Sequence, residues 1–433
     1  MTLRERLFSL EAFGIKLGLD NMRTLVEALG HPERAYPTVH VAGTNGKGSV
    51  CAIVERALRA AGYRTGLYTS PHLDRLEERM AIDGQPVASD RLDAAAGRVF
   101  AAVDAAIADG RLTVTPTFFE VTTAIAFEVF RAEPVDVAVI EVGLGGRFDA
   151  TNIITPVAGA IVSIAFDHER HLGSTLGQIG GEKGGIAKPG IPLVVGALPP
   201  EALHAIERVR SEAGAPPLVH AEDAVGLDGL DAGRARVLVR SQRWPGLPVL
   251  PLSLLGRHQV ANAAVAVRLL EVLSRHGVRM GADAVARGLT EARWPARLEW
   301  LRTPDGELLI DAAHNPAGAE ALASYLHDAG RAPLPVVLAA MQDKDVDGMV
   351  RPLASVASRF VATGVATPRA FAPETLASRI AAAAPGTPVS SVPDARAAID
   401  DALARDRRAV AAGSIYFIGP LRARLIESGA VPI

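Results

Sequence analysis

Short apolar runs rich in valine and isoleucine alternate along this chain with longer stretches rich in alanine and arginine. Runs of about four to eight apolar residues are typical of buried strands, and alanine-rich stretches such as 94–110 and 379–384 favour helix. This alternation predicts parallel strands joined by crossover helices. The predicted strands lie at residues 37–42, 64–69, 135–142, 158–164, 192–195, 308–311, 335–339, 360–365 and 409–413.

Polar residues lie at or just beyond the ends of several of these predicted strands. Ser70 follows the second run, Glu141 lies in the third, and Asp311 ends the sixth. In open α/β sheets, ligands bind outside the carboxyl ends of the strands. We therefore expect one sheet edge to gather the functional residues of the amino-terminal part.

A second series of strands and helices follows the segment Arg293-Trp-Pro-Ala-Arg297, where proline interrupts a helical pattern. Domain boundaries often fall in such segments, and 433 residues are enough for two or three domains. We expect an α/β protein with a large domain of mostly parallel sheet at residues 1–292. A smaller Rossmann-like α/β domain is expected at residues 293–433.

Composition narrows the class of protein. Lysine and arginine total 45 against 48 acidic residues, a net charge of −3, which argues against nucleic acid or an anionic membrane as a partner. No apolar run approaches the roughly 20 residues of a membrane span, and the first residues lack a signal-peptide pattern. Cys51 is the single cysteine, so no disulfide can form within the chain. We expect a cytoplasmic monomer that acts on small molecules.

The strongest chemical signal is a glycine-rich loop after the first predicted strand. Residues 43–49 read Gly-Thr-Asn-Gly-Lys-Gly-Ser, and a helix is expected to begin near Cys51. Amides of such a loop can surround phosphates, its lysine adds positive charge, and its serine can ligate Mg²⁺. The loop departs from the strict phosphate-loop pattern at Val41, where a glycine is usual, and at the inserted Gly48. The strand-loop-helix context predicts a phosphate-loop NTPase-like domain.

Two further residues, Glu141 and His168, have the chemistry of metal ligands, and Lys183 lies where glycines permit close approach of a ligand. Glu141 ends an apolar strand, His168 follows another, and Lys183 lies among glycines as one of only five lysines. Each also has a plainer interpretation, as a strand-end cap, a hydrogen-bonded histidine or a solvated lysine. The position of Glu141 relative to the phosphate loop favours a magnesium ligand. Spacing alone does not decide for the other two.

Motifs along nearly the whole chain resemble those of the folylpolyglutamate synthase and dihydrofolate synthase family, within the ATP-dependent Mur ligase superfamily. Besides residues 43–49, the motifs are Phe13-Gly-Ile-Lys-Leu-Gly18, Thr69-Ser-Pro-His-Leu73, Glu78-Arg79, Glu141-Val-Gly-Leu-Gly-Gly146, Asp149-Ala-Thr-Asn152, Asp167-His168, Glu182-Lys183, Arg257-His-Gln-Val-Ala-Asn262, Arg293-Trp-Pro-Ala-Arg-Leu-Glu299, Asp311-Ala-Ala-His-Asn-Pro316, Asp343-Lys-Asp345 and Gly413-Ser-Ile-Tyr416. Their shared order makes the resemblance specific. The departures from the strict phosphate loop match this family's own version.

The resemblance implies a role for each site residue. The expected ATP contacts are Gly43, Thr44, Asn45, Gly46, Lys47, Gly48, Ser49, Asn262, Arg297, Asp311 and His314. A first Mg²⁺ would lie among Ser49, Ser70 and Glu141, and a second between His168 and a carbamylated Lys183. Ser70, His72, Phe118 and Asp149 would border the pterin, with Arg79, His314 and Ser414 as candidates for glutamate. Lys47, His168 and Lys183 are the expected catalytic residues.

The activity that the resemblance implies is ATP-dependent addition of L-glutamate to tetrahydrofolate and to dihydropteroate, through an acyl phosphate. Alternatives are a monofunctional folylpolyglutamate synthase, or a phosphate-loop kinase or nucleotide-binding protein without ligase activity. A cell-wall ligase is disfavoured, because 42 residues before Gly43 are too few for a uridine-nucleotide domain.

Overall fold

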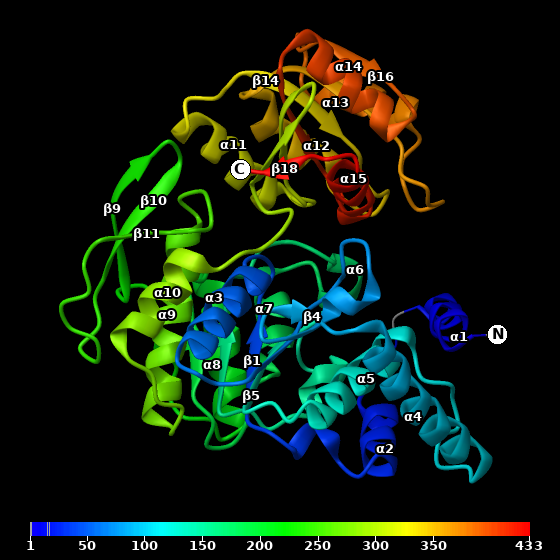
Figure 1. Ribbon diagram of the computed structural model, residues 1–433, viewed down its shortest axis with the longest axis vertical. Helices are drawn as coiled ribbons and strands as arrows, with labels where there is room; N and C mark the ends of the chain where they lie inside the picture. Colours follow the sequence, from blue (N-terminus) through cyan, green and yellow to red (C-terminus); the bar gives the residue numbers. More distant parts are fainter. Residues whose placement is uncertain (1, 15, 17) are drawn as a thin grey trace. The chain divides into compact units, whose positions relative to one another are not determined.

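The computed structural model describes residues 2–14, 16 and 18–433, which form two compact units (Figure 1). Ile15 and Leu17 of the motif at residues 13–18 lie outside the described residues. The second unit begins its main segment at Arg293, and it also contains two earlier segments of the chain. The first unit contains residues up to 225, 239–247 and 261–292, and the second contains 226–238, 248–260 and 293–433.

An eight-stranded sheet forms the centre of the first unit, in the order β4-β3-β2-β5-β1-β6-β7-β8. Strands β2, β5, β1, β6, β7 and β8 are parallel, as predicted, whereas β3 and β4 extend the sheet in antiparallel fashion. The strands are β1 (Thr38–Ala42), β2 (Thr65–Tyr68), β3 (Met80–Ile82), β4 (Gln85–Pro86), β5 (Val137–Glu141), β6 (Ala158–Ile161), β7 (Leu193–Val195) and β8 (Val219–His220).

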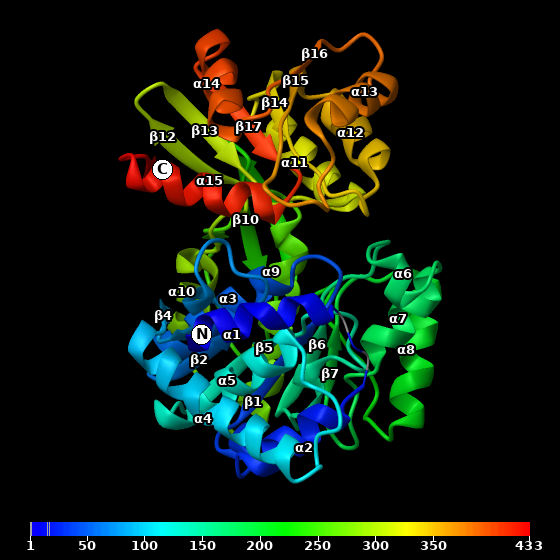
Figure 2. The same cartoon turned by 90° about the vertical axis from the view of Figure 1, so that its right-hand side faces the viewer.

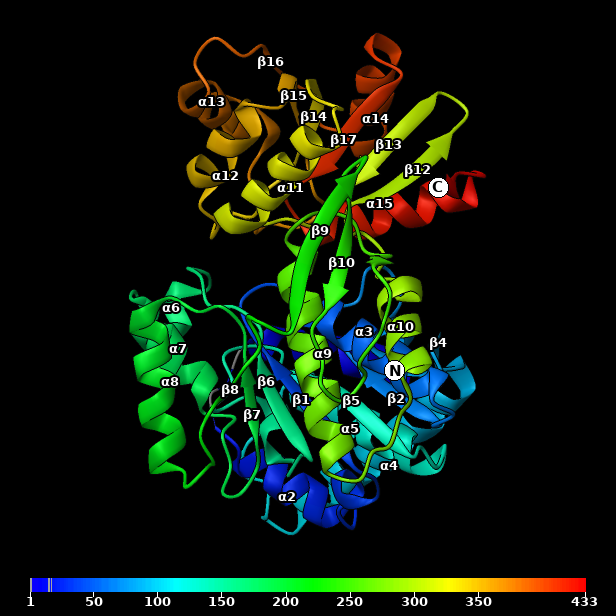
Figure 3. The same cartoon turned by 90° about the vertical axis from the view of Figure 1, so that its left-hand side faces the viewer.

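Helices cover both faces of this sheet, with α4 and α5 on the side that Figure 2 presents and α9 and α10 on the side that Figure 3 presents. Every residue of β1 and β5 is therefore buried, which explains why apolar residues dominate both strands and why the polar His40 and Glu141 are buried with them. The helices are α1 (Leu3–Ser9), α2 (Asp20–Ala28), α3 (Lys47–Ala60), α4 (Ser89–Ala108), α5 (Phe118–Ala132), α6 (Glu169–Leu172), α7 (Leu176–Gly184), α8 (Pro200–Glu212), α9 (Gln259–Arg275) and α10 (Ala282–Glu291), with short 3₁₀ turns η1 (Leu10–Phe13), η2 (Pro32–Arg34), η3 (Leu76–Arg79) and η4 (Ala150–Ile153).

The second unit contains a seven-stranded sheet in the order β16-β15-β14-β17-β13-β12-β18. Its inner strands are parallel, and β12 and β18 are antiparallel additions at one edge. The strands are β12 (Glu299–Thr303), β13 (Gly306–Ile310), β14 (Leu334–Leu338), β15 (Ala357–Ala362), β16 (Val389–Ser391), β17 (Arg408–Ala412) and β18 (Val431–Pro432). The helices are α11 (Pro316–Asp328), α12 (Val346–Ala354), α13 (Pro373–Ala383), α14 (Ala395–Arg405) and α15 (Ile415–Glu427).

A three-stranded sheet accounts for the two earlier segments of the second unit. Its strands are β9 (Val225–Asp231), β10 (Arg234–Val239) and β11 (Leu250–Pro251). The turn between β9 and β10 packs closely against α11: a Cβ on Gly233 would lie only 2.6 Å from the ring of Tyr325. Arg257 also pairs with Asp328 at the end of that helix. These contacts place residues 226–238 and 248–260 with the second unit, although the sequence assigns all of 1–292 to the first domain.

Candidate active site

The glycine-rich loop of residues 43–46 connects β1, near the middle of the first sheet, to α3. Gly46 has φ 82° and caps the helix, which begins at Lys47 and not near Cys51 as predicted. The helix starts earlier because Gly46 adopts a left-handed conformation that allows the chain to turn directly into it. The first turn of α3 therefore presents its unpaired amides beside the loop, where an anion is favourably bound.

Backbone and side-chain hydrogen bonds fix this loop to the segment that follows β6. The amide of Thr44 donates to Ser163 O at 2.8 Å, and the amide of Asn45 donates to Ser163 Oγ at 3.0 Å. The hydroxyl of Thr44 accepts a bond from the Ala165 amide. The loop conformation is thus set by residues far away in the sequence.

Three predicted residues from separate elements meet beside the loop. Lys47 Nζ lies 3.9 Å from Glu141 Oε1, at the end of the neighbouring strand β5. The other carboxylate oxygen of Glu141 accepts from the Ser70 amide at 3.4 Å. Glu141 is 4% exposed, and Ser49, in the first turn of α3, is equally buried. A buried carboxylate with hydroxyl groups nearby is the oxygen-rich donor set that Mg²⁺ prefers.

Lys183 reaches the same loop from α7. Its ammonium donates to the carbonyl of Gly43 at 3.1 Å, and the residue is 4% exposed. Burial and the charge of Lys47 lower the pKa of Lys183 to about 7. Close packing holds α7 in place, since a Cβ on Gly146 would lie 2.9 Å from the carbonyl oxygens of Glu182 and Lys183. A substantial fraction of Lys183 is therefore a neutral amine at neutral pH.

His168 lies at the amino end of α6 in a left-handed conformation with φ 51°. Its side chain is 40% exposed, and its Nε2 is 3.9 Å from the carboxylate of Asp167, which is 8% exposed. The same carboxylate accepts the His168 amide at 2.9 Å. Asp167 also acts electrostatically on Lys183, opposing the decrease in its pKa. Asp167 therefore lies beside His168 and also acts electrostatically on Lys183.

Asn262, on α9, packs directly against Gly46. A Cβ at position 46 would clash with the Asn262 side-chain oxygen and would lie 2.8 Å from Val162. Asn262 is 7% exposed. Asn262, predicted to contact ATP, therefore lies at the loop although more than two hundred residues of sequence separate the two.

A second group of predicted residues surrounds η3. Arg79 donates from Nε to His72 Nδ1 at 2.8 Å, and its guanidinium lies 5.2 Å from the ring centre of Phe118. Burial and the charge of Arg79 lower the pKa of His72 to about 4. The ring of His72 is consequently neutral at neutral pH and accepts at Nδ1, which leaves the proton on Nε2.

Both carboxylate oxygens of Asp149 accept hydrogen bonds from within the protein. Its two oxygens accept from the Leu144 amide at 2.8 Å and from the amide and hydroxyl of Thr151 at 3.0 and 2.5 Å. The hydroxyl of Thr151 in turn contacts Nε2 of His40, a fully buried residue of β1, at 2.8 Å. Because that hydroxyl donates to Asp149, it must accept from His40, so His40 carries its proton on Nε2. Burial raises the pKa of Asp149.

The remaining predicted residues lie in the second unit. Asp311, His314 and Ser414 follow the adjacent strands β13 and β17, and Arg297 precedes β12. Asp311 accepts from the Leu298 amide at 2.8 Å and the Ala313 amide at 2.7 Å, which fixes the turn before α11. Nδ1 of His314 lies 2.9 Å from Ala312 O. Ser414 caps α15 and is 2% exposed. Arg297 Nη1 contacts its neighbouring carbonyl, that of Ala296, at 3.4 Å.

Ser163 and Asp167 are functional candidates that sequence reasoning did not assign. Asp167 had a signal, since it precedes His168 directly, whereas Ser163, two residues beyond the end of β6, has none. Among the described residues, no group of three or more His, Cys, Asp or Glu side chains forms a ready metal site. None of the described helices has the length and apolar character required to cross a bilayer.

Comparisons with known proteins agree on one family. Residues 296–414 match the family model described as Mur ligase, glutamate ligase domain. The dihydrofolate synthase/folylpolyglutamate synthase of Bacillus subtilis is 35% identical, over 95% of this chain and 96% of the relative. A Mycobacterium tuberculosis folylpolyglutamate synthase complexed with ADP superposes with a TM-score of 0.87 at 32% identity, covering 100% of this chain and 99% of that one.

Two further solved structures carry other ligands. E. coli FolC in complex with DHPP and ADP has a TM-score of 0.84 at 29% identity, covering 99% of this chain and 98% of that one. A bifunctional folylpolyglutamate synthase/dihydrofolate synthase with Mn, AMPPNP and L-glutamate bound has a TM-score of 0.82 at 30% identity, with 98% of each chain covered.

Proposed function

This chain belongs to the folylpolyglutamate synthase/dihydrofolate synthase family of Mur ligases, and we propose that it adds L-glutamate to tetrahydrofolate and to dihydropteroate with ATP. The observation that carries this proposal is the meeting of Lys47, Glu141 and Lys183 around the loop that begins at Gly43. The amides and the lysine of such a loop can bind the phosphates of a nucleoside triphosphate. The bifunctional relative from Bacillus subtilis supports the use of both pterin substrates.

The reaction requires activation of a carboxylate, because a free carboxylate is too poor an electrophile for an amine. Transfer of the γ-phosphoryl group of ATP to the carboxylate gives an acyl phosphate and ADP. The glutamate amine then attacks the carbonyl carbon, a C–N bond forms, and phosphate leaves. The loop amides and Lys47 bind the phosphates and stabilise the negative charge that develops in both steps.

Ser49, Ser70 and Glu141 would hold one Mg²⁺, and His168 with a modified Lys183 would hold a second. Mn in a family structure supports the presence of a divalent metal. When bound, the cation neutralises phosphate charge and polarises the transferred group. Glu141 suits this role because it is buried and lies beside the phosphate loop.

Lys183 is proposed to be carbamylated. Its neutral amine can attack carbon dioxide, forming an N–C bond and releasing one proton, so that a cation becomes a carboxylate. In the part of the chain that the structure describes, its ammonium forms no ion pair and donates only to the Gly43 carbonyl, which leaves the buried positive charge poorly compensated. Modification removes that charge and supplies an oxygen ligand.

Substrate contacts are assigned to two groups of residues. His72, Phe118 and Asp149 are proposed to border the pterin, together with Ser70, and Asp149 would act there mainly by holding Leu144 and Thr151. Arg79, His314 and Ser414 are proposed for glutamate. Arg297, Asp311 and His314 are proposed to contribute to nucleotide binding, and Asn262 is proposed to do so from beside Gly46.

The test is incubation with ATP, Mg²⁺ and glutamate plus either tetrahydrofolate or dihydropteroate, followed by mass analysis. We expect each pterin to gain the mass of a glutamate residue, with ADP formed only in the complete mixture. A product from tetrahydrofolate alone would identify a monofunctional folylpolyglutamate synthase. ADP release without glutamate would instead identify a kinase or simple ATPase.

A further inference from the structure

The short amino-terminal helix α1 is firmly docked within the first unit. A capping box between Thr2 and Glu5 begins it, and Leu7, 1% exposed, anchors it in the core. Arg6 forms an ion pair with Asp104 of α4, and its guanidinium lies 4.2 Å from the ring centre of Phe100. These contacts hold α1 on α4 without involving any residue of the proposed site.

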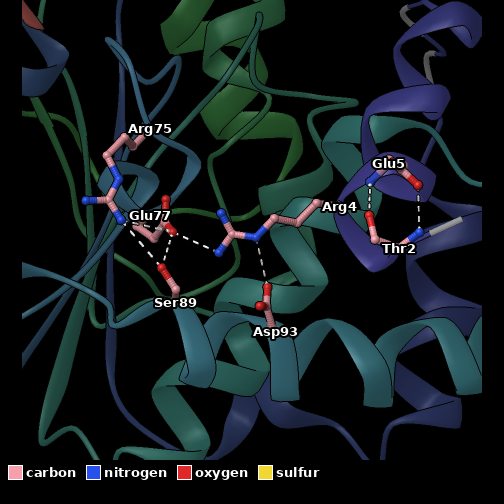
Figure 4. Close-up of polar contacts among 7 residues, drawn as sticks. All are labelled: Thr2, Arg4, Glu5, Arg75, Glu77, Ser89 and Asp93. Carbon is pink, nitrogen blue, oxygen red and sulfur yellow. Dashed lines mark hydrogen bonds and ion pairs between the residues drawn. The ribbon is translucent and has the colours of Figure 1, made fainter.

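A different face of α1 carries Arg4 and Phe8, which are four residues apart and therefore neighbours on the helix surface. Arg4 bridges two carboxylates, as Figure 4 shows: Nη2 donates to Glu77 at 2.8 Å, and Nε donates to Asp93 of α4 at 3.1 Å. Glu77 belongs to η3 and is 2% exposed. Arg4 thus connects η3 to the rigid surface of α4.

Glu77 is the centre of this cluster. Besides Arg4, its Oε1 accepts from Ser89 at 2.6 Å and from Arg75 at 3.3 Å (Figure 4). Burial alone would raise the pKa of Glu77, but hydrogen bonds from Ser89, the backbone and Arg4 lower it to about 2. A buried carboxylate that stays charged needs cationic partners. Arg75 flanks η3 itself, whereas Arg4 comes from α1, so the bond to Arg4 constrains where η3 can lie relative to α1.

Both contacts of this helix face lead to the same pair of residues. The turn η3 that Arg4 holds ends at Arg79, two residues beyond Glu77, and Arg79 packs on Phe118. Phe8 stacks directly on Phe118, with ring centres 5.8 Å apart and planes inclined by 24°. One turn of α1 therefore reaches Arg79 through the backbone of η3 and reaches Phe118 through an aromatic contact.

We propose that Arg4 and Phe8 are positioning residues that hold Phe118 in place for the pterin and Arg79 in place for glutamate. This inference rests on the proposed function, in which Phe118 and the loop before η3 border the pterin. Its physical basis is that Arg6 and Leu7 dock α1 on α4 and in the core, whereas Arg4 also bonds Glu77 of η3 and Phe8 stacks on Phe118 of the proposed site.

The test compares Arg4→Ala with Arg6→Ala, two truncations on the same helix that each remove an ion pair to α4. The loss of Arg4 should raise KM for the two pterin substrates and for glutamate about three- to five-fold, the upper range for an ion pair whose arginine is partly exposed, and leave KM for ATP unchanged. Arg6→Ala should lower thermal stability and leave all of these KM values near wild type. Arg4→Lys, which keeps a positive charge near Glu77, should restore part of the pterin affinity.

Hydrogen exchange on the resting enzyme makes the test independent of catalysis. Amides of residues 69–79 should exchange faster in Arg4→Ala than in wild type or Arg6→Ala. Equal exchange in all three proteins, or equal effects of the two truncations on pterin KM, would overturn the positioning role. If wild type fails to join glutamate to either pterin, the proposed function fails, while the exchange data still decide whether Arg4 holds η3.

Phe8 is tested by Phe8→Leu and Phe8→Ala. Leucine keeps apolar volume and loses the flat ring, so both variants should raise pterin KM if stacking on Phe118 matters. A normal pterin KM in Phe8→Leu, with an increase only in Phe8→Ala, would show that Phe8 merely fills space.

Discussion

The ammonium of Lys183 donates a hydrogen bond to the carbonyl of Gly43, joining α7 to the first residue of the phosphate loop across 140 positions of sequence. Both partners lie in the first unit, and Lys183 is buried. A lysine placed there contacts backbone instead of a carboxylate. That environment favours loss of its proton, and it underlies the first prediction.

Lys183→Arg is expected to be inactive, although it conserves positive charge, because guanidinium can neither react with carbon dioxide nor ligate Mg²⁺. Lys183→Ala should regain activity when a short carboxylic acid is added. Lys188→Arg is the matched control, since Lys188 donates to Asn152 and an arginine can do the same. Labelled ¹³C-bicarbonate should give a carbamate signal in wild type and none in Lys183→Arg. Full activity of the arginine variant, with no carbamate in wild type, would reject the modification.

Lys47→Ala should lower kcat by about 10²-fold or more, the loss expected when one preorganised charge at a developing oxyanion is removed. The side chain also donates to the carbonyls of Gly43 and Thr44, so the loop itself is affected. Nucleotide affinity and the melting temperature should be measured alongside turnover. Near-normal kcat in a folded variant would remove Lys47 from the reaction.

Gly46→Ala should weaken binding of an ATP analogue by about tenfold or more, because the new methyl group clashes with Asn262 and Val162 and the residue has a positive φ. Gly62, just beyond the other end of α3, is the matched control. It has φ 91° with no neighbour within 4 Å, so Gly62→Ala isolates the backbone strain. Calorimetric titration should show normal affinity for Gly62→Ala. Equal losses in both variants would mean that packing on Asn262 is unimportant.

Acid should destabilise the protein below about pH 6.5, partly through His40. Burial, with help from the charge of Lys188, lowers the pKa of His40 to about 3, so the unfolded chain binds a proton that the folded chain refuses. Stability from this group is complete above pH 6.5 and is lost as pH falls towards 3, by at most about 1.4 kcal/mol per pH unit. His72 acts in the same direction.

Urea unfolding of wild type, His40→Gln and the exposed-site control His276→Gln at several pH values checks this prediction. The dependence on pH should be shallower in His40→Gln, whose amide can still donate to Thr151, and unchanged in His276→Gln. Identical slopes in all three proteins would show that His40 does not contribute.

The sequence by itself determined the fold class and the elements that carry the chemistry. The run at residues 37–42 is β1, that at 135–142 contains β5, and the predicted mostly parallel sheet is confirmed. Local signals suffice here, because a buried parallel strand is mostly apolar and a phosphate loop needs glycines at fixed spacing. The family was likewise evident from motifs, and the comparisons confirm it.

Only the tertiary structure decided which distant residues meet. The antiparallel strands β3 and β12 and the three-stranded sheet went unpredicted, because β3 has only three residues and because charged residues interrupt the apolar pattern of β9, β10 and β12. The earlier start of α3 depends on the conformation of Gly46, which long-range packing on Val162 and Asn262 helps to fix. The bonds from Lys183 to Gly43 and from Arg4 to Glu77 depend on strand order and helix docking. No local pattern encodes such pairs, since burial of two remote segments together creates them.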